Sequence, residues 1–213
     1  FSLLIIFDSC KDKTSTSDAT EAAASAVGQK YTTSAESAQI NWNGAGPTKE
    51  HAGTINISGG ELFVQDNALT SGSFSIDMNT ITVTDLEGDK KADLEAHLKG
   101  TQAEGAEDFF HVTKFPTSTF DIISITPSTD SGAAFVVKGN LTMKGLANEV
   151  SIPANITTSA DQVKVESLPF TIDRTKWGIN YKSKNVFKEI GDKFINDEIT
   201  LQINLSATPA PVQ

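Results

Sequence analysis

Apolar residues at every second position recur along this chain from about residue 38 to residue 205, and this alternation restricts the fold more than any other feature. In one typical segment, Phe74, Ile76 and Met78 alternate with polar residues. A period of two sends successive side chains to opposite faces of a strand, so each segment predicts a β-strand with one buried and one wetted face. About eight or nine such segments, separated by turns such as Gly59-Gly60, predict an all-β protein.

An antiparallel sheet with this many strands either closes into a barrel, which removes its edges, or packs as a β-sandwich. The alternation is the same in both architectures and does not distinguish them. A single helix is expected to interrupt the strands near residues 89–99, with Gly100 as its stop signal.

The first residues form the only continuous apolar run, at 1–7. A helix of that length covers about 10 Å, far less than the ~30 Å of a hydrocarbon core, so we interpret residues 1–9 as the remnant of a signal peptide. The segment Phe-Asp-Ser-Cys that ends at Cys10 resembles a degenerate bacterial lipobox with the cysteine in the lipid-accepting position. A free thiol in a floppy terminus is the alternative.

Residues 11–30 contain no aromatic residue and one valine, so they cannot bury enough apolar surface to offset the entropy of ordering. We therefore expect a lipid anchor and disordered tether over 10–30, one domain over 31–208 and a tail over 209–213. An apolar run, a cysteine, a polar tether and then a domain is the order that an anchored envelope protein needs. It predicts export to the bacterial cell envelope, in the periplasm or at the surface, with membrane contact through the N-terminal lipid anchor.

The composition excludes some functions. The net charge of −10 and the pI of about 4.7 argue against a nucleic-acid partner, because affinity for phosphate backbones is largely electrostatic. A single cysteine excludes an internal disulfide.

The sequence shows no catalytic constellation. Its three histidines, His51, His97 and His111, include no close pair at ligand spacing, so we expect no metal site. We expect His97 to be solvated on the helix, and the other two to be hydrogen-bonded structural residues. Cys10 lies in the tether and cannot be held against a base, and no Gly-x-Ser-x-Gly elbow occurs. We predict no enzyme and no cofactor.

Several short motifs follow one another in a specific order. They are Ile40-Asn41-Trp42, His51-Ala52-Gly53, Phe74-Ser75-Ile76-Asp77, Asp-Phe-Phe at 108–110, Lys-Phe-Pro at 114–116, Gly-Asn-Leu-Thr-Met-Lys-Gly at 139–145 and Phe-Thr-Ile-Asp-Arg-Thr-Lys-Trp-Gly-Ile at 170–179. Together, over about residues 31–208, they resemble the YceI-like polyisoprenoid-binding family. The resemblance implies a lipocalin-like antiparallel barrel of about eight strands that holds a polyisoprenoid or fatty-acid-derived lipid.

Nine apolar residues are our candidates for the lining of the pocket. They are Phe74, Ile76, Met78, Phe120, Ile152, Ile156, Phe170, Ile172 and Trp177. Residues 173–188 carry five bases and a single acid, Asp173, so Arg174, Lys176 and Lys182 are candidates to bind an anionic head group. Alternatively, Arg174 pairs with a carboxylate and is purely structural.

The function that we expect is the binding and carrying of one long apolar ligand. A structural or adhesive envelope lipoprotein without a ligand is the first alternative, and an enzyme that acts on a bound lipid is the second. The expected partners are a small-molecule lipid and, as a further option, a second copy of the chain in a homodimer.

Overall fold

A computed structural model describes residues 16–18, 22–129 and 132–211. The strands are β1 (Thr16–Asp18), β2 (Gln29–Ser34), β3 (Ala38–Ala45), β4 (Glu50–Gln65), β5 (Ala68–Val83), β6 (Thr117–Pro127), β7 (Phe135–Met143), β8 (Leu146–Thr158), β9 (Val163–Ser167), β10 (Phe170–Asp173) and β11 (Glu198–Pro209). The helices are α1 (Gly88–Lys99) and two 3₁₀ turns, η1 (Arg174–Trp177) and η2 (Gly191–Lys193).

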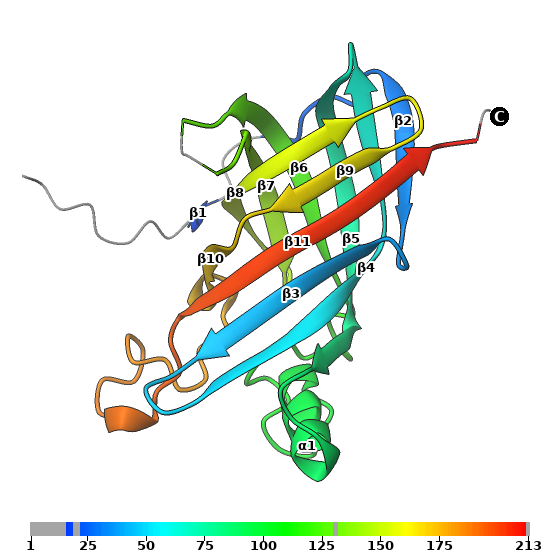
Figure 1. The fold of residues 1–213 in the computed structure, drawn as a ribbon. Coiled ribbons are helices and arrows are strands. Elements are labelled where there is room, and N and C mark those ends of the chain that lie inside the picture. The colour runs from blue at the N-terminus through cyan, green and yellow to red at the C-terminus, as the bar shows by residue number, and fades with distance from the viewer. Residues whose placement is uncertain (1–15, 19–21, 130–131, 212–213) are drawn as a thin grey trace, which may run out of the picture.

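Eight strands close an antiparallel ring in the order β3, β4, β5, β6, β7, β8, β9, β11 and back to β3 (Figure 1). Strand β2 continues β3 between β4 and β11, and β10 continues β9 along β11. The barrel prediction is therefore confirmed, and the sandwich alternative is wrong.

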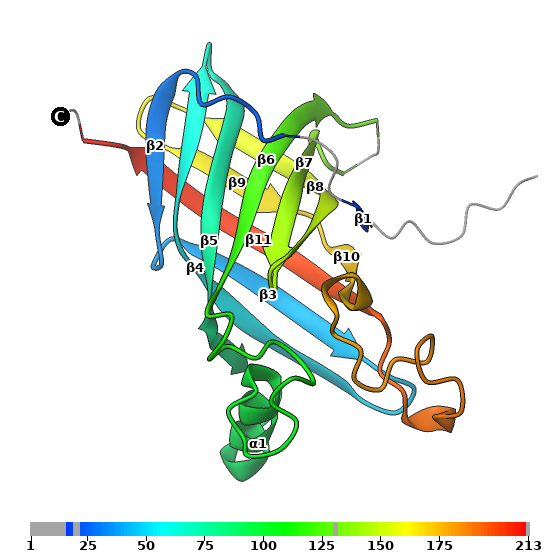
Figure 2. The same cartoon turned by 180° about the vertical axis from the view of Figure 1, so that it is seen from behind.

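The two ends of the barrel differ (Figures 1 and 2). At the end that we call the C-terminal end, β11 finishes and β4 turns tightly into β5 through Asp66 and Asn67, both with positive φ. At the opposite end, which we call the helix end, lie α1, residues 100–116, the β3–β4 hairpin and the long segment 174–197. The predicted helix is confirmed, and its C-cap Gly100 has the left-handed conformation with φ 67°.

Part of the segment expected to be a tether is ordered. Strand β1 pairs with β8 along Thr16–Asp18 and Asn148–Val150, and β2 begins at Gln29 rather than after residue 30. The reason is that β9 pairs with β8 only from Ala154 onward and leaves the earlier part of that edge available for another strand. Residues 1–9 and Cys10, with their predicted leader and anchor, lie outside the described residues.

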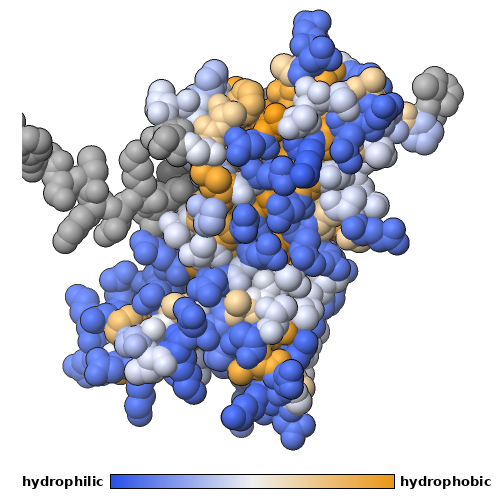
Figure 3. Space-filling model, viewed as in Figure 1, coloured by the Kyte–Doolittle hydropathy of each residue, from blue (hydrophilic) through white to orange (hydrophobic). Residues whose placement is uncertain are grey.

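The alternating residues form one core. Of the seven residues predicted from alternation to point inward, Phe74, Ile76, Met78, Ile152, Phe170 and Ile172 are buried. Ile156 is only partly buried, because it lies near the end of β8 opposite Val165, which is itself only partly buried. The outer face in Figure 3 is mainly hydrophilic, as one wetted face per strand requires.

Among the described residues, no helix has the length and apolarity needed to cross a lipid bilayer.

Candidate functional site

A cavity of about 490 Å³ occupies the helix end of the barrel. Its deep wall is made by inward-facing side chains of the strands, and its outer part by side chains of α1 and the loops. The main apolar members are Ile40, Trp42, Ile55, Ile76, Met78, Ile81, Leu94, Leu98, Phe109, Phe110, Leu141, Met143, Phe194, Ile195, Ile199 and Leu201. The cavity is thus an apolar chamber within the size range of ligand-binding pockets.

Trp42 lies flat on the neighbouring strand in the wall of this cavity. Its cross-strand partner is Gly53, where a Cβ would clash with the indole ring, so the glycine leaves room for the ring. The indole Nε1 has no hydrogen-bond partner among the described residues. Trp42 therefore contributes apolar surface to the cavity without a polar anchor of its own.

Three rings from separate elements meet at the side of the cavity. His97 of α1 lies 5.1 Å from Phe109 and 4.9 Å from Tyr181 between ring centroids, and Phe109 lies 5.3 Å from Tyr181. Their contacts join α1, residues 100–116 and the segment 174–197. These edge-on and tilted arrangements are favourable for aromatic pairs and stabilise the loop cluster.

Lys144 attaches the loop of this cluster to the β7–β8 turn. Its Nζ donates to the carbonyl oxygens of Phe109 at 2.6 Å and Glu107 at 3.2 Å. Burial lowers the pKa of Lys144, while the nearby charges of Glu107 and Asp108 oppose that shift.

Two histidine–aspartate pairs flank the cavity. His97 Nε2 lies 2.8 Å from Asp108 Oδ2, and His51 Nδ1 lies 2.8 Å from Asp85 Oδ2. Both histidines line the cavity. The expectation of a solvated His97 is therefore wrong, because this residue lies on the side of α1 that faces the loops and is partly buried there. Partial burial alone would raise the pKa of Asp85, but hydrogen bonds from the Ala52 N–H and from His51 outweigh it and lower that pKa.

Arg174 also lines the cavity, but its buried guanidinium is bound by the chain itself. Its side chain is 1% exposed and donates to three backbone carbonyls, those of Asn196 at 3.0 Å, Ile179 at 2.7 Å and Ile195 at 3.0 Å. Asp197 Oδ1 lies 3.5 Å from its Nη2. Burial lowers the pKa of Arg174, and Asp197 and Asp173 oppose this. These contacts hold the two ends of the segment 174–197 together.

The other cationic candidates differ in position. Lys182 lines the cavity with its Nζ 5.0 Å from the centre of the Tyr181 ring. Lys176 is exposed and does not line it; its backbone carbonyl accepts a hydrogen bond from Asn148. Lys49 and Lys193, which we did not predict, also line the mouth, together with Asp192. The mouth is therefore mainly cationic in an otherwise acidic protein.

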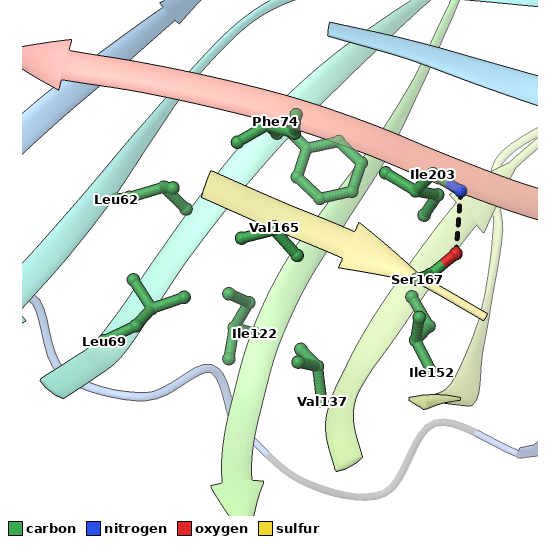
Figure 4. A pocket seen from close by; sticks show the side chains of 10 residues that line it. Leu62, Leu69, Phe74, Ile122, Val137, Ile152, Val165, Ser167 and Ile203 are labelled. Carbon is green, nitrogen blue, oxygen red and sulfur yellow. Dashed lines mark hydrogen bonds between the residues drawn. The ribbon is translucent and has the colours of Figure 1, made fainter. Parts of the chain in front are cut away.

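The predicted lining residues fall into three groups. Ile76 and Met78 line the cavity, whereas Phe74 and Ile152 line a separate void of about 30 Å³ nearer the C-terminal end (Figure 4). The remainder line neither space: Phe120, Phe170, Ile172 and Trp177 are packed in the core, and Ile156 is partly buried. Alternation identifies the inner face of a strand but not the level of a residue along the barrel axis, so it could not separate these groups.

The void in Figure 4 shows how closely this other half is packed. Leu62, Leu69, Ile122, Val137 and Val165 converge on it, and the only hydrogen bond drawn runs from the Ile203 N–H to Ser167 Oγ, at 2.8 Å. Its volume equals about one water molecule's share of liquid water. This half has no room for a ligand.

Sequence reasoning missed most of the wall of the cavity. Ile40, Ile55, Ile199 and Leu201 stood in the alternating segments, but nothing in the pattern gave their level in the barrel. Phe109 and Phe110 belong to an aromatic-rich stretch from 108 to 120, which was a usable signal for closure of a barrel end. No comparable signal marks Phe194 or Ile195.

No three His, Cys, Asp or Glu side chains in the described part of the chain gather closely enough to hold a metal ion.

Fold and cavity together define a closed antiparallel barrel with an apolar chamber at one end. The sequence profile of the YceI-like domain matches residues 29–207, and the chain belongs to this family. A comparison with proteins of curated function finds no match.

Solved structures share the fold at low sequence identity. BcnA of Burkholderia cenocepacia superposes with a TM-score of 0.58 at 20% identity, over 80% of this chain and 96% of that one. A polyisoprenoid binding domain from Saccharophagus degradans, implicated in plant cell wall breakdown, gives 0.57 at 12% identity, over 85% and 99% of the two chains. The YceI protein of Campylobacter jejuni gives 0.50 at 17% identity, over 74% and 85%.

Proposed function

We propose that this protein binds one long-chain apolar lipid, of the polyisoprenoid or fatty-acid-derived kind, and carries or sequesters it in the bacterial cell envelope. The observation that carries the proposal is the cavity of about 490 Å³ with an apolar wall. A packed barrel would instead favour the structural or adhesive role, because such a role requires no chamber. Membership of the YceI-like family and the polyisoprenoid binding domain among similar structures support the same choice.

A binding role is favoured over an enzyme that acts on the lipid. Of the side chains that line the cavity, His51, His97 and Asp192 could accept a proton, and each histidine uses one ring nitrogen to contact a carboxylate. No hydrogen bond joins either imidazole to a serine or threonine hydroxyl within the described ranges, so no activated nucleophile supports acyl transfer.

The lipid itself is the test. Native mass spectrometry of freshly purified full-length protein should show an adduct of one lipid per chain, and extraction with organic solvent should release a polyisoprenoid or acyl compound. Protein that carries no adduct, and that takes up neither a prenol nor a fatty acid when these are supplied, would favour the structural role.

We further propose that a polar or anionic head group lies at the mouth, beside Lys182. Lys49 and Lys193 lie at the same mouth, whereas the guanidinium of Arg174 is occupied by chain carbonyls. A hydrogen bond to a charged group is worth about 1.5–3 kcal/mol, so Lys182→Met should weaken binding of farnesyl phosphate about tenfold or more and leave farnesol binding unchanged. Lys188→Met, at an exposed position outside the cavity, is the matched control. Equal losses for both ligands would eliminate the head-group role of Lys182.

Anchoring through Cys10 completes the proposal and explains how the protein stays in the envelope. Stable anchoring needs more than one acyl chain, because one myristoyl-like chain holds only reversibly. In cell fractionation, the unmodified sequence and Ser9→Ala should remain with membranes, and Cys10→Ser should move to the soluble fraction. Persistence of Cys10→Ser in membranes would refute the anchor.

The homodimer option is tested separately, by the sedimentation of the detergent-free Cys10→Ser protein, which distinguishes one chain from two by mass.

A further inference from the structure

Two interior spaces lie at successive levels of the same barrel. Along β5, Met78 and Ile76 line the large cavity, and the next inward residue, Phe74, lines the small void. Along β11, Leu201 lines the cavity and Ile203 the void. The void therefore continues the direction of the cavity toward the C-terminal end.

A layer of side chains separates the two spaces. Ile57, Phe120 and Val150 line neither of them and are almost fully buried. The ring of Phe120 stacks on Phe74, with centroids 5.1 Å apart and planes inclined by 24°. These two rings form the part of the partition that lies on β5 and β6.

Gly139 of β7 leaves room for the Phe120 ring, which lies over this adjacent strand. The neighbouring inward positions of β7, Val137 and Leu141, line the void and the cavity. At Gly139 itself, a Cβ would overlap the far edge of the Phe120 ring. The ring thus fills the space that a side chain at 139 would occupy. Phe120 of β6 therefore forms the partition at this level in front of both β6 and β7.

The volumes limit what the cavity can hold. An engineered protein cavity of about 150 Å³ accommodates benzene, so a cavity of about 490 Å³ accommodates roughly 15–20 carbon atoms. The void beyond the partition, about 30 Å³, has room for one or two carbon atoms at most. A chain much longer than the cavity must leave its surplus outside the barrel.

We propose that the Phe74–Phe120 partition sets a ceiling on ligand length, so that this protein selects apolar chains of roughly 15–20 carbon atoms, such as farnesyl, geranylgeranyl or ordinary long acyl chains. This inference rests on the proposed function and specifies the class of lipid for the same site. Phe120 is the specificity-determining residue: its ring stops the chain end, and Gly139 provides the room for that ring.

The direct test is a competition among prenols of increasing length. Full-length protein is equilibrated with an equimolar mixture of geraniol, farnesol, geranylgeraniol and solanesol in neutral detergent micelles, and the bound fractions are read by native mass spectrometry. The affinities are referred to the free prenol in water by correcting for each prenol's partition into the micelles, since the gain of about fourfold per buried CH₂ applies to transfer from water. On this scale, affinity should rise at least about tenfold per isoprene unit while the chain still enters the cavity. Between geranylgeraniol and solanesol it should change less than about threefold, since the added units stay outside.

Variants move the ceiling in both directions. Phe120→Ala removes the ring and joins the cavity to the void, so the limit should rise by about one isoprene unit. Ile76→Phe fills part of the cavity and should lower it, and this variant still tests the inference if Phe120→Ala does not fold. Ile122→Ala is the matched control: it is the next inward residue on β6, it enlarges only the void, and it should leave the ceiling unchanged.

The outcomes separate the two proposals. Solanesol bound at least about tenfold more tightly than geranylgeraniol would overturn the ceiling and leave lipid binding intact. A ceiling that Ile122→Ala raises as much as Phe120→Ala would also overturn the role of the partition. Failure of every prenol, and of palmitic acid in a parallel experiment, would overturn the proposed function and the ceiling together.

Discussion

In the C-terminal half of the barrel, Leu62, Ile152 and Ile203 meet around a void of about 30 Å³, whereas in the helix half Ile55, Ile76 and Leu201 face a cavity of about 490 Å³. Both halves use similar aliphatic side chains on the same strands. The C-terminal half is stabilised by contact between apolar side chains. The helix half lacks those contacts across its centre, and polar groups hold its rim together, chiefly Arg174, Lys144 and the two histidine–aspartate pairs.

The comparison teaches that a hollow barrel end needs a different kind of support from a packed one. Dispersion contacts hold a filled interior together because each buried side chain touches many others. Around a chamber those contacts are missing on one side, so the loops need directional bonds to keep their positions. Substitutions that remove the polar supports should therefore cost more at the helix end than their surface location suggests.

Arg174→Ala should have the largest effect on stability. It leaves three carbonyl acceptors without their donor and Asp197 without its cation, and breaking a buried charged network costs about 3–5 kcal/mol. Urea unfolding should show this loss, with partial recovery in Arg174→Lys and almost no change in the exposed control Lys188→Ala. A loss below about 1 kcal/mol would contradict this structural role and restore Arg174 as a head-group candidate.

The next largest effect is the loss of stability on shortening an isoleucine of β11, which should differ between Ile203 and Ile199. Ile203 lies in the packed half, so Ile203→Ala should cost about 2–5 kcal/mol through lost contacts and a new void. Ile199 faces the cavity and is only partly buried, so Ile199→Ala should cost about 1–2 kcal/mol. Chemical denaturation of both variants under the same conditions measures the difference. Equal costs would show that the cavity wall is packed as tightly as the core.

The two tryptophans of the chain sharpen the contrast further. Trp177 is fully buried, and its Nε1 donates to the Leu141 carbonyl at 3.0 Å, so Trp177→Phe should cost about 1–3 kcal/mol. Trp42 lines the cavity and its Nε1 has no partner among the described residues, so Trp42→Phe should cost less than about 1 kcal/mol. Thermal unfolding monitored by circular dichroism tests the order of the two. A larger loss of stability in Trp42→Phe than in Trp177→Phe would contradict this prediction and show that the indole at the cavity contributes more to stability.

The smallest effect concerns pH. The lowered pKa of Asp85 means that its contribution to stability is present above the unfolded value of about 3.8 and is lost as the pH falls through the lower folded value. Because the carboxylate is about one-third exposed, this contribution should be below about 1 kcal/mol. Asp85→Asn should therefore flatten the decline of stability between about pH 5 and pH 3 relative to the unmodified protein. An unchanged decline in urea titrations across that range would show that the His51–Asp85 pair does not support the rim.

Alternation predicted the strands and their buried faces, the family resemblance implied the barrel, and neither located the chamber, for a physical reason. Alternation reports which face of a strand is buried, and for Phe74, Met78 and Ile172 that was sufficient. The level of a residue along the axis depends on strand register and bulges, such as the shift between Ile57 and Gly59, which no local pattern encodes. Ile156 packs against the core but is only partly buried, since alternation does not say how close a residue lies to the end of the barrel.

The loops around the cavity were harder still. Arg174 stood out as a basic residue in a basic segment, and only the fold shows that its donors face chain carbonyls rather than a ligand. His97 was expected in water because its helix is charged, yet tertiary contacts with Phe109 and Tyr181 place it in the wall. Such side chains are positioned by partners far away in sequence.

The fit of the Phe120 ring over Gly139 has a consequence for how the chain can change over time. A methyl group at position 139 is harmful while Phe120 is present, because the two would overlap. After Phe120→Ala the overlap with the ring is gone, but the added carbon would still lie 2.7 Å from the backbone carbonyl oxygen of Asp121, so the methyl group would stay harmful, though less so. Descendants of this chain should therefore keep glycine at position 139 even after position 120 has been shortened, and should rebuild a partition from strands other than β7.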